Sequence, residues 1–364
     1  MRVLDELHGH EALLEGLWRT ASSGRLPHAI SFEGPSGVGK FNAALRFASG
    51  LLCENGPGAP CGTCAPCKRV RSGGRLGNHP DLYLIDPVEE AREQSSAKKV
   101  VTITIKIERI AIRAGEEDCA EGFLRLVSQE DGWRIVILRD AHLMQAGAQN
   151  ALLKTLEEPG KNTLLILETA QPGDLLPTIL SRLVRLRFGR LPLETTERVL
   201  IEEGLEREVA PILAAWSEGA PGEALRLNRE GCLAIRSLFL SVLAGERGAF
   251  EGVGELWKLP GEFIGSTPKA RDRHRARVAL DVLLDLLGDQ LRWQEGVATT
   301  ALRHRDLAEA GVFQPQSPAL LSRTINACLE LRGAMSGNVS PDATMERCFL
   351  ALESGRTVPA PAGR

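Results

Sequence analysis

Residues 34–41 have the composition and spacing of a loop that binds nucleotide phosphates. They read Gly-Pro-Ser-Gly-Val-Gly-Lys-Phe, which follows the pattern G-x-x-x-x-G-K up to its last position. In such a loop glycines turn backbone N–H groups inward and a lysine contacts the outer phosphates; here these residues are Gly34, Gly37, Gly39 and Lys40. The pattern then needs Ser or Thr, whose hydroxyl binds magnesium, but residue 41 is Phe. We therefore expect a phosphate-binding loop whose metal site is damaged.

The acidic part of the same site also departs from its pattern. Four apolar residues at 135–138 predict a buried strand, and in nucleotide hydrolases of this kind two acids follow that strand. The first acid helps to hold magnesium and the second polarises water. Here the first of these positions is Arg139, and only Asp140 remains. Because a guanidinium repels a metal cation, we expect Arg139 to weaken magnesium binding further.

Four cysteines lie close together in the spacing C-x7-C-x2-C-x2-C: Cys53, Cys61, Cys64 and Cys67. Four thiolates around a tight turn match a tetrahedral zinc site, and an iron–sulfur cluster or chance are the alternatives. A short, proline-containing insertion favours structural zinc, one ion per chain. Because all four ligands are cysteines, no coordination position is left open for catalysis. The other cysteines are scattered among apolar residues and are expected to be small buried side chains: Cys119, Cys232, Cys328 and Cys348.

Alternating strands and helices must position these residues. Periodicity predicts an N-terminal helix over 4–22, helices after the loop to about 52, near 123–127 and over 148–158, and strands at 29–32, 82–85, 101–107, 135–138, 163–167 and 184–188. This alternation predicts a parallel sheet covered by helices on both faces. From about residue 190 the strand signals stop, and only helical patterns follow. The tail at 357–364 is expected to be disordered.

Composition excludes several classes of protein. The chain has 364 residues, enough for two or three domains, and its 44 Lys and Arg against 47 Asp and Glu give no overall basic field for nucleic acid. Aromatic content is 4%, too low for a platform that stacks bases. With no signal peptide and no membrane span in the sequence, we expect a cytoplasmic protein without a membrane partner. A basic run after the cysteines is interpreted as a solvated face rather than a DNA contact: Lys68, Arg69, Arg71 and Arg75.

Together these stretches resemble the AAA+ clamp-loader family of bacterial DNA polymerase III, most closely its delta-prime branch. The resemblance rests on the loop at 34–41, the cysteines at 53–67, and four further motifs: Asn-His-Pro-Asp at 78–81, Asp-Ala-His at 140–142, Asn-Ala-Leu-Leu-Lys-Thr-Leu-Glu-Glu-Pro at 150–159 and Leu-Ser-Arg at 180–182. Asn338 and the helix after it resemble the end of the family's collar domain. The match is dense over 26–190 and weaker to 352.

The resemblance implies an architecture and a role. It implies an AAA+ domain over 1–190 with the zinc module at 53–67 inserted, a helical lid over 191–235 and an all-α collar over 236–356. The family forms a hetero-pentamer of motor (gamma/tau), delta and delta-prime subunits, which loads the sliding clamp onto primed DNA. In that ring an arginine from a Ser-Arg pair acts on the ATP of the adjacent subunit. By this resemblance the pair is Ser181 and Arg182.

Three departures indicate that the chain does not hydrolyse ATP. Phe41 replaces the magnesium hydroxyl, Arg139 replaces the metal carboxylate, and Gly222 falls where a motor subunit of the family carries a phosphate-sensing arginine. The loop either binds nucleotide weakly or only keeps its shape. The alternative function is a gamma/tau-like motor ATPase with an unusual metal site, which ATP turnover by the isolated chain would reveal. An unrelated degenerate scaffold is disfavoured by the cysteines and the Ser181–Arg182 pair.

Overall fold

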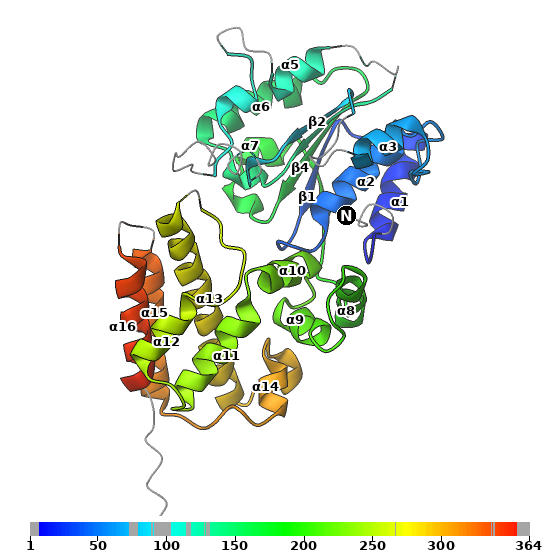
Figure 1. The fold of residues 1–364 in the computed structure, drawn as a ribbon. Coiled ribbons are helices and arrows are strands. Elements are labelled where there is room, and N and C mark those ends of the chain that lie inside the picture. Colours follow the sequence, from blue (N-terminus) through cyan, green and yellow to red (C-terminus); the bar gives the residue numbers. More distant parts are fainter. Residues whose placement is uncertain are drawn as a thin grey trace, which may run out of the picture. The chain divides into compact units, whose positions relative to one another are not determined.

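A computed structural model describes residues 7–72, 79–88, 90, 103–113, 118–126, 128, 132–265, 267–335, 337 and 339–354. The described chain forms two compact units, one ending at Thr195 and one beginning at Thr196 (Figure 1). Each unit is treated by itself. Asn78, Arg75, Asn338 and the tail at 357–364, all singled out above, lie outside the described residues, as does the side chain of Arg71.

The first unit is built on a five-stranded parallel sheet in the order β2-β3-β4-β1-β5. Its strands are β1 (Ala29–Glu33), β2 (Leu82–Ile85), β3 (Arg134–Leu138), β4 (Thr163–Thr169) and β5 (Val184–Arg187). Every residue of β1, β3 and β4 is buried, as expected for central strands covered on both faces. The predicted parallel α/β class is therefore confirmed.

Helices lie on both sides of this sheet (Figure 1). On one side are α1 (Glu11–Ser22), α2 (Lys40–Leu52) and α3 (Ala65–Ser72); α2 packs on β1, β3 and β4, and both α1 and α3 pack on α2. On the other side are α5 (Ala120–Arg125), α6 (Ala146–Glu157) and α7 (Pro177–Leu180). Short 3-10 turns are η1 (Ile107–Arg109), η2 (Ala141–Leu143) and η3 (Pro172–Asp174).

The predicted strand over 101–107 is wrong in the part that the structure describes. Only Ile105 pairs, in a single parallel bridge to Met144, and residues Ile107–Arg109 turn into η1. Ile105 is buried, whereas Ile103 is 40% exposed. The alternating pattern was correct about Ile105, but alternation alone does not supply a neighbouring strand to extend the ladder.

The predicted start of the N-terminal helix is also wrong. The pattern placed its beginning at residue 4, but α1 begins at Glu11 and Leu7–His10 are not helical. Gly9 has φ +83°, and a Cβ there would lie 2.4 Å from Leu191 Cδ2. A side chain is disfavoured at this left-handed backbone position, and Gly9 allows the chain to turn just before α1 begins.

All regular elements among the described residues of the second unit are helices. Its helices are α9 (Ala210–Trp216), α10 (Pro221–Arg229), α11 (Cys232–Leu243), α12 (Ala249–Leu256), α13 (Pro268–Gln294), α14 (Arg305–Glu309), α15 (Pro318–Ala334) and α16 (Pro341–Ser354), with η4 (Thr299–Ala301), while α8 (Leu193–Glu202) spans the boundary between the units. One apolar cluster runs from Leu200 to Leu352. Its further division into a lid and a collar stays a prediction.

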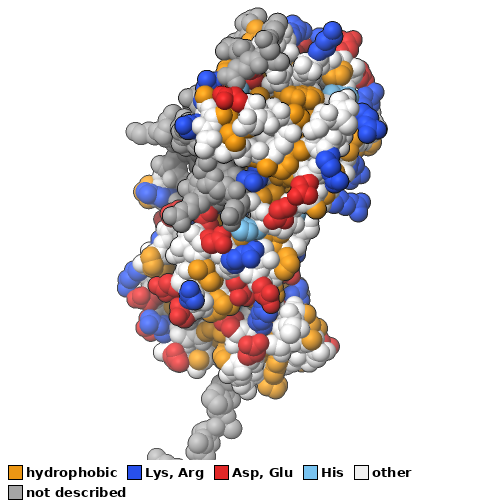
Figure 2. Space-filling model, turned by 90° about the vertical axis from the view of Figure 1, so that its right-hand side faces the viewer, with side chains coloured by type: hydrophobic (Ala, Val, Ile, Leu, Met, Phe, Trp, Pro, Cys, Tyr) orange, Lys and Arg blue, Asp and Glu red, His pale blue; other side chains and the backbone are white. Residues whose placement is uncertain are grey.

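Charges on this unit are mixed in sign. In Figure 2, Asp and Glu side chains alternate with Lys and Arg side chains over the helical lower part of the view, without a field of one sign. None of the described helices is both long and apolar enough to cross a bilayer.

Candidate functional site

The loop after β1 has the backbone that its glycines permit. Gly34, Gly37 and Gly39 all have positive φ, of +152°, +77° and +96°. Gly34 also makes a close approach, because a Cβ there would lie 2.1 Å from the carbonyl oxygen of Phe188. Gly39 precedes Lys40, the first residue of α2. The sequence therefore predicted the loop and its helix correctly.

Lys40 points into its own loop. Its Nζ donates to the carbonyl oxygens of Gly34 at 2.9 Å and Pro35 at 2.7 Å, and lies 3.3 Å from Glu168 Oε1. The side chain is 1% exposed. The three N–H donors of an ammonium group thus have three partners within the chain. In this arrangement the Lys40 ammonium group stabilises the loop itself.

Phe41 and Arg139, two of the three departures from the nucleotide-site patterns, lie against each other. The Arg139 guanidinium carbon is 4.9 Å from the centre of the Phe41 ring, close enough for a cation–π contact. Arg139 Nη1 donates to Asp86 Oδ2 at 2.8 Å, and its Nε lies 3.9 Å from Glu168 and 4.0 Å from Asp140. Burial acts to lower the pKa of Arg139, but the carboxylates, Asp86 first among them, outweigh it and raise the pKa.

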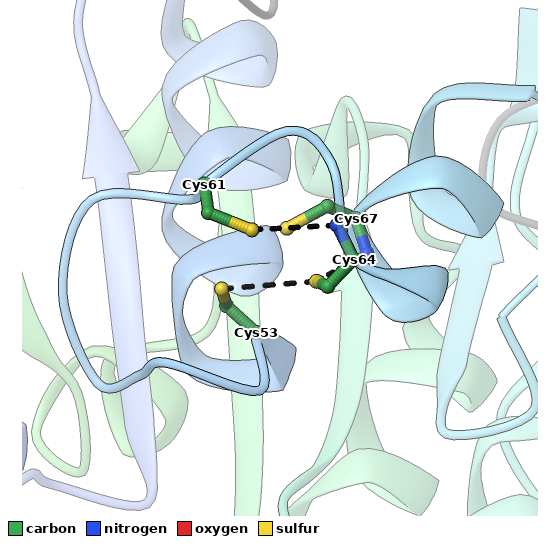
Figure 3. Close-up of side chains that lie close together, drawn as sticks. All are labelled: Cys53, Cys61, Cys64 and Cys67. Carbon is green, nitrogen blue, oxygen red and sulfur yellow. Dashed lines mark hydrogen bonds between the residues drawn. The ribbon is translucent and has the colours of Figure 1, made fainter.

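The four cysteines of the C-x7-C-x2-C-x2-C pattern converge between the end of α2 and the start of α3 (Figure 3). All four Sγ atoms lie within 4.8 Å of one another, and Cys53 and Cys64 are 3.9 Å apart. A Zn–S bond of about 2.3 Å in tetrahedral geometry places sulfurs about 3.8 Å apart, so the donors fit such an ion. Backbone N–H groups of Cys64 and Cys67 point at the sulfurs of Cys61 and Cys64.

The protonation of two of these thiols is shifted in opposite directions. Hydrogen bonding from Thr63 lowers the pKa of Cys61 to about 5, whereas burial raises the pKa of Cys67 to about 12. A metal ion would resolve this difference by binding all four as thiolates. The remaining cysteines are buried, as predicted from their apolar surroundings: Cys119, Cys232, Cys328 and Cys348.

Ser181 and Arg182 follow α7 on the surface of the first unit. Arg182 Nη2 lies 2.7 Å from Glu157 Oε1 at the end of α6, and its Nη1 donates to the Thr178 carbonyl at 2.9 Å. Ser181 Oγ donates to the same carbonyl at 3.0 Å and lies 3.4 Å from the Arg182 guanidinium. The Arg182 side chain is 36% exposed. Its cationic end is therefore held by one exposed carboxylate, one carbonyl and the Ser181 hydroxyl.

Comparison with known proteins decides the family. A family model described as "DNA polymerase III, delta subunit" matches residues 9–192. DNA polymerase III subunit delta' of Bacillus subtilis is 31% identical over 93% of this chain and 94% of its own. This chain belongs to the DNA polymerase III delta-prime subunit family.

The chain is also similar to a second delta' subunit, to a tau subunit and to a gamma-subunit-related protein. The Pseudomonas aeruginosa delta' subunit is 33% identical over 80% of this chain and 77% of its own. The tau subunit of Escherichia coli is 30% identical over 60% of this chain but only 31% of its own. A solved structure of a gamma-subunit-related protein from Thermotoga maritima aligns with 94% of this chain and 99% of its own, at 17% identity and a TM-score of 0.47.

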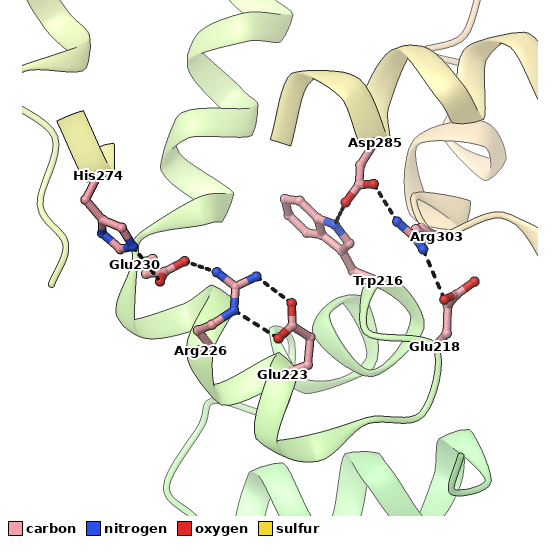
Figure 4. Close-up of polar contacts among 8 residues, drawn as sticks. All are labelled: Trp216, Glu218, Glu223, Arg226, Glu230, His274, Asp285 and Arg303. Atoms are coloured by element: carbon pink, nitrogen blue, oxygen red, sulfur yellow. Dashed lines mark hydrogen bonds and ion pairs between the residues drawn. The ribbon is translucent and has the colours of Figure 1, made fainter. Parts of the chain in front are cut away.

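In this delta-prime family member, Gly222 lies in the first turn of α10 and offers no side chain. The first arginine of that helix, Arg226, is one turn further on. It pairs with Glu223 and Glu230, and His274 lies beside Glu230 (Figure 4). The carboxylate of Glu223 raises the pKa of Arg226. Arg226 is thus already neutralised within the second unit.

A second polar group in Figure 4 joins α9 to α13. Trp216 Nε1 donates to Asp285 at 3.1 Å, and Arg303 bridges Asp285 and Glu218 at 2.5 and 3.2 Å. These hydrogen bonds and ion pairs link α9 to α13 within the second unit.

Sequence reasoning missed two carboxylates in the candidate nucleotide site, Asp86 and Glu168. Asp86 directly follows β2, and Glu168 is the second-last residue of β4. Parallel strands bring their carboxyl ends to one edge, which is where ligands bind in such sheets. An acid at the end of each predicted strand was the signal that could have found them.

Proposed function

We propose that this chain is a catalytically silent subunit of the bacterial DNA polymerase III clamp loader. The observation that carries the proposal is the contact between Arg139 and Phe41. A guanidinium lies within 4.0 Å of Asp86, Asp140 and Glu168, which are carboxylates that a magnesium ion could otherwise bind. Without that ion the β- and γ-phosphates of ATP lose the cation that neutralises their developing charge during transfer. The chain then has a nucleotide-site fold without the means to hydrolyse ATP.

The active contribution of the subunit is then Arg182, acting with Ser181 on ATP bound by the neighbouring subunit. Support comes from its exposure and from its partners. An exposed ion pair such as Arg182–Glu157 is worth about 0–1 kcal/mol, so a phosphate can displace Glu157 readily. Guanidinium–phosphate contacts are among the stronger charge-assisted hydrogen bonds. A freed Arg182 would stabilise the charge that develops on the transferred phosphoryl group.

The proposed partners are those of the clamp-loader family that the chain resembles. We infer a cytoplasmic hetero-pentamer with motor (gamma/tau) and delta subunits, which places the sliding clamp on primed DNA during replication. The lid over 191–235 and the collar over 236–356 would give this subunit its place in the ring. The cysteine cluster holds one structural zinc ion, since four thiolates leave no open position for chemistry.

Reconstitution with motor and delta subunits tests the trans role of Arg182. We expect Arg182→Ala to leave assembly intact and to lower DNA-stimulated ATP hydrolysis by the complex. Arginine fingers contribute about 10³–10⁵ in GTPases, and one site among several will show less. Arg25→Ala, which removes an exposed arginine elsewhere on the unit, is the matched control. Full activity of the Arg182→Ala complex would refute the role.

The isolated chain tests the absence of hydrolysis. We expect no turnover of Mg·ATP by the purified subunit, and no difference between it and Lys40→Ala. Turnover that Lys40→Ala abolishes would instead support the alternative function, a motor-type ATPase with an unusual metal site.

A further inference from the structure

Three carboxylates meet at one edge of the sheet in the first unit. Asp86, Asp140 and Glu168 come from the ends of β2, β3 and β4, which are adjacent strands. Asp86 is 4% exposed and Glu168 is 7% exposed. Burial raises the pKa of Glu168, against the opposing charge of Lys40. Buried carboxylates destabilise a fold unless cations compensate them. This edge of the sheet therefore requires a cation, which can be a basic side chain or a metal ion.

The chain itself supplies that charge. Lys40 lies 3.3 Å from Glu168, and Arg139 lies 2.8 Å from Asp86 and within 4.0 Å of the other two carboxylates. The Arg139 guanidinium is therefore the one cation among the described residues that reaches all three. A hard divalent cation would bind the same oxygens, so the guanidinium and magnesium compete for one position.

Phe41 contacts the same guanidinium. Its ring lies 4.9 Å from the Arg139 guanidinium carbon, at the sequence position where a hydroxyl would have coordinated the metal. An aromatic face stabilises a guanidinium but offers no ligand to magnesium. A Ser or Thr at position 41 would offer magnesium a hydroxyl ligand but no aromatic face to the guanidinium. The two departures are therefore complementary, and either one alone would leave the site mismatched.

We propose that Arg139 is the resident cation of this site in place of magnesium, and that Phe41 and Arg139 form one specificity-determining pair that excludes magnesium-bound nucleotides. Lys40 then serves the loop itself, since its ammonium group bonds the Gly34 and Pro35 carbonyls instead of a phosphate. This inference rests on the proposed function, because it gives the physical means by which the subunit is silent. Two cations of the chain, Lys40 and Arg139, thus lie against the three carboxylates without a ligand.

The first experiment replaces the resident cation in the isolated full chain. Arg139→Met keeps an unbranched side chain on Phe41 but leaves the three carboxylates short of a cation. We expect its unfolding temperature to become dependent on MgCl₂, rising by about 3–6 °C at about ten times the dissociation constant. The wild-type chain and Arg139→Lys should show no such rise. An unfolding temperature of Arg139→Met that does not change with MgCl₂ would overturn the proposal.

The second experiment tests the coupling and does not depend on the stability of Arg139→Met. Phe41→Thr retains the resident guanidinium and should not bind Mg·ADP, whereas Phe41→Thr with Arg139→Asp should bind it, as measured by calorimetry. Binding by Phe41→Thr alone, or none by the double variant, would show that the pair does not set specificity. Both experiments use the isolated chain, while the trans role of Arg182 is measured in the complex, so either idea can fail without the other.

Discussion

Arg182 and Glu157 form a pair whose strength matters for the proposed trans role. Their atoms are 2.7 Å apart, but both side chains are exposed, at 36% and 53%. In the proposed role the guanidinium would exchange Glu157 for a phosphate of the neighbouring subunit's ATP. We expect Glu157→Gln to change the stability of the isolated chain little, since such pairs contribute about 0–1 kcal/mol. ATP hydrolysis by the complex should be unchanged or raised, by up to about fivefold.

A loss of activity in Glu157→Gln as large as that of Arg182→Ala would contradict this. It would show that Glu157 orients the arginine for its work instead of competing for it. Steady-state hydrolysis with primed DNA and clamp present separates the two outcomes, and rescue by Glu157→Asp would support an orienting role.

The candidate nucleotide site shows how far single residues can be predicted. Spacing alone identified the glycines and Lys40, because a phosphate-binding loop is a local structure. It could not show that Lys40 bonds to Gly34, Pro35 and Glu168, since Glu168 is 128 positions away in the chain and meets the loop only through the order of the strands. Phe41 and Arg139 were each recognised as departures, yet their contact is a property of the sheet.

At the scale of elements, the cysteine cluster joins α2 to α3. Cys53 directly follows α2 and Cys67 lies in α3, which has only 8 residues. A helix of that length is marginal by itself, so we expect a bound metal to hold it. The purified chain should contain about one zinc ion, and chelation should speed hydrogen exchange over 53–72 while the sheet stays protected.

A pair of variants separates metal binding from the loss of a thiol. Cys64→Ser should lose the zinc and show the same exchange as the chelated chain. Cys119→Ser should keep it, because Cys119 caps α5 by accepting from Gly122 N, which a serine hydroxyl also does well. Elemental analysis that finds no metal in the wild-type chain would rule out this account of the cluster.

Elements were predicted best where periodicity and burial coincide. The five strands that pair in the sheet were all found, and in β1, β3 and β4 the signal was a continuous apolar run that is buried on both faces. Residues 103–107 carry the alternating pattern of a strand, but only Ile105 meets a partner, Met144. Alternation reports which side of a segment is buried, and it does not report whether another backbone lies alongside.

At the scale of the whole molecule, charge limits how the chain can meet DNA. The 44 basic residues are outnumbered by 47 acidic ones, and the helical unit in Figure 2 mixes both signs. Lys68 and Arg69 on α3 are the described part of the basic run after the cysteines, and Lys68 is exposed. We predict that these side chains face solvent and that the assembled ring, rather than this chain alone, binds DNA.

The test compares the salt dependence of primed-DNA binding by the complex with and without Lys68→Ala and Arg69→Ala together. Each phosphate contact adds about 0.9 to the slope of log K against log salt on duplex DNA. Solvated side chains should leave both the affinity and this slope unchanged, and the isolated chain should bind DNA only weakly at physiological salt. A slope that falls by about two in the double variant would mean that α3 touches the DNA backbone. In that case the cysteine cluster would serve to position a DNA contact as well as to stabilise the fold.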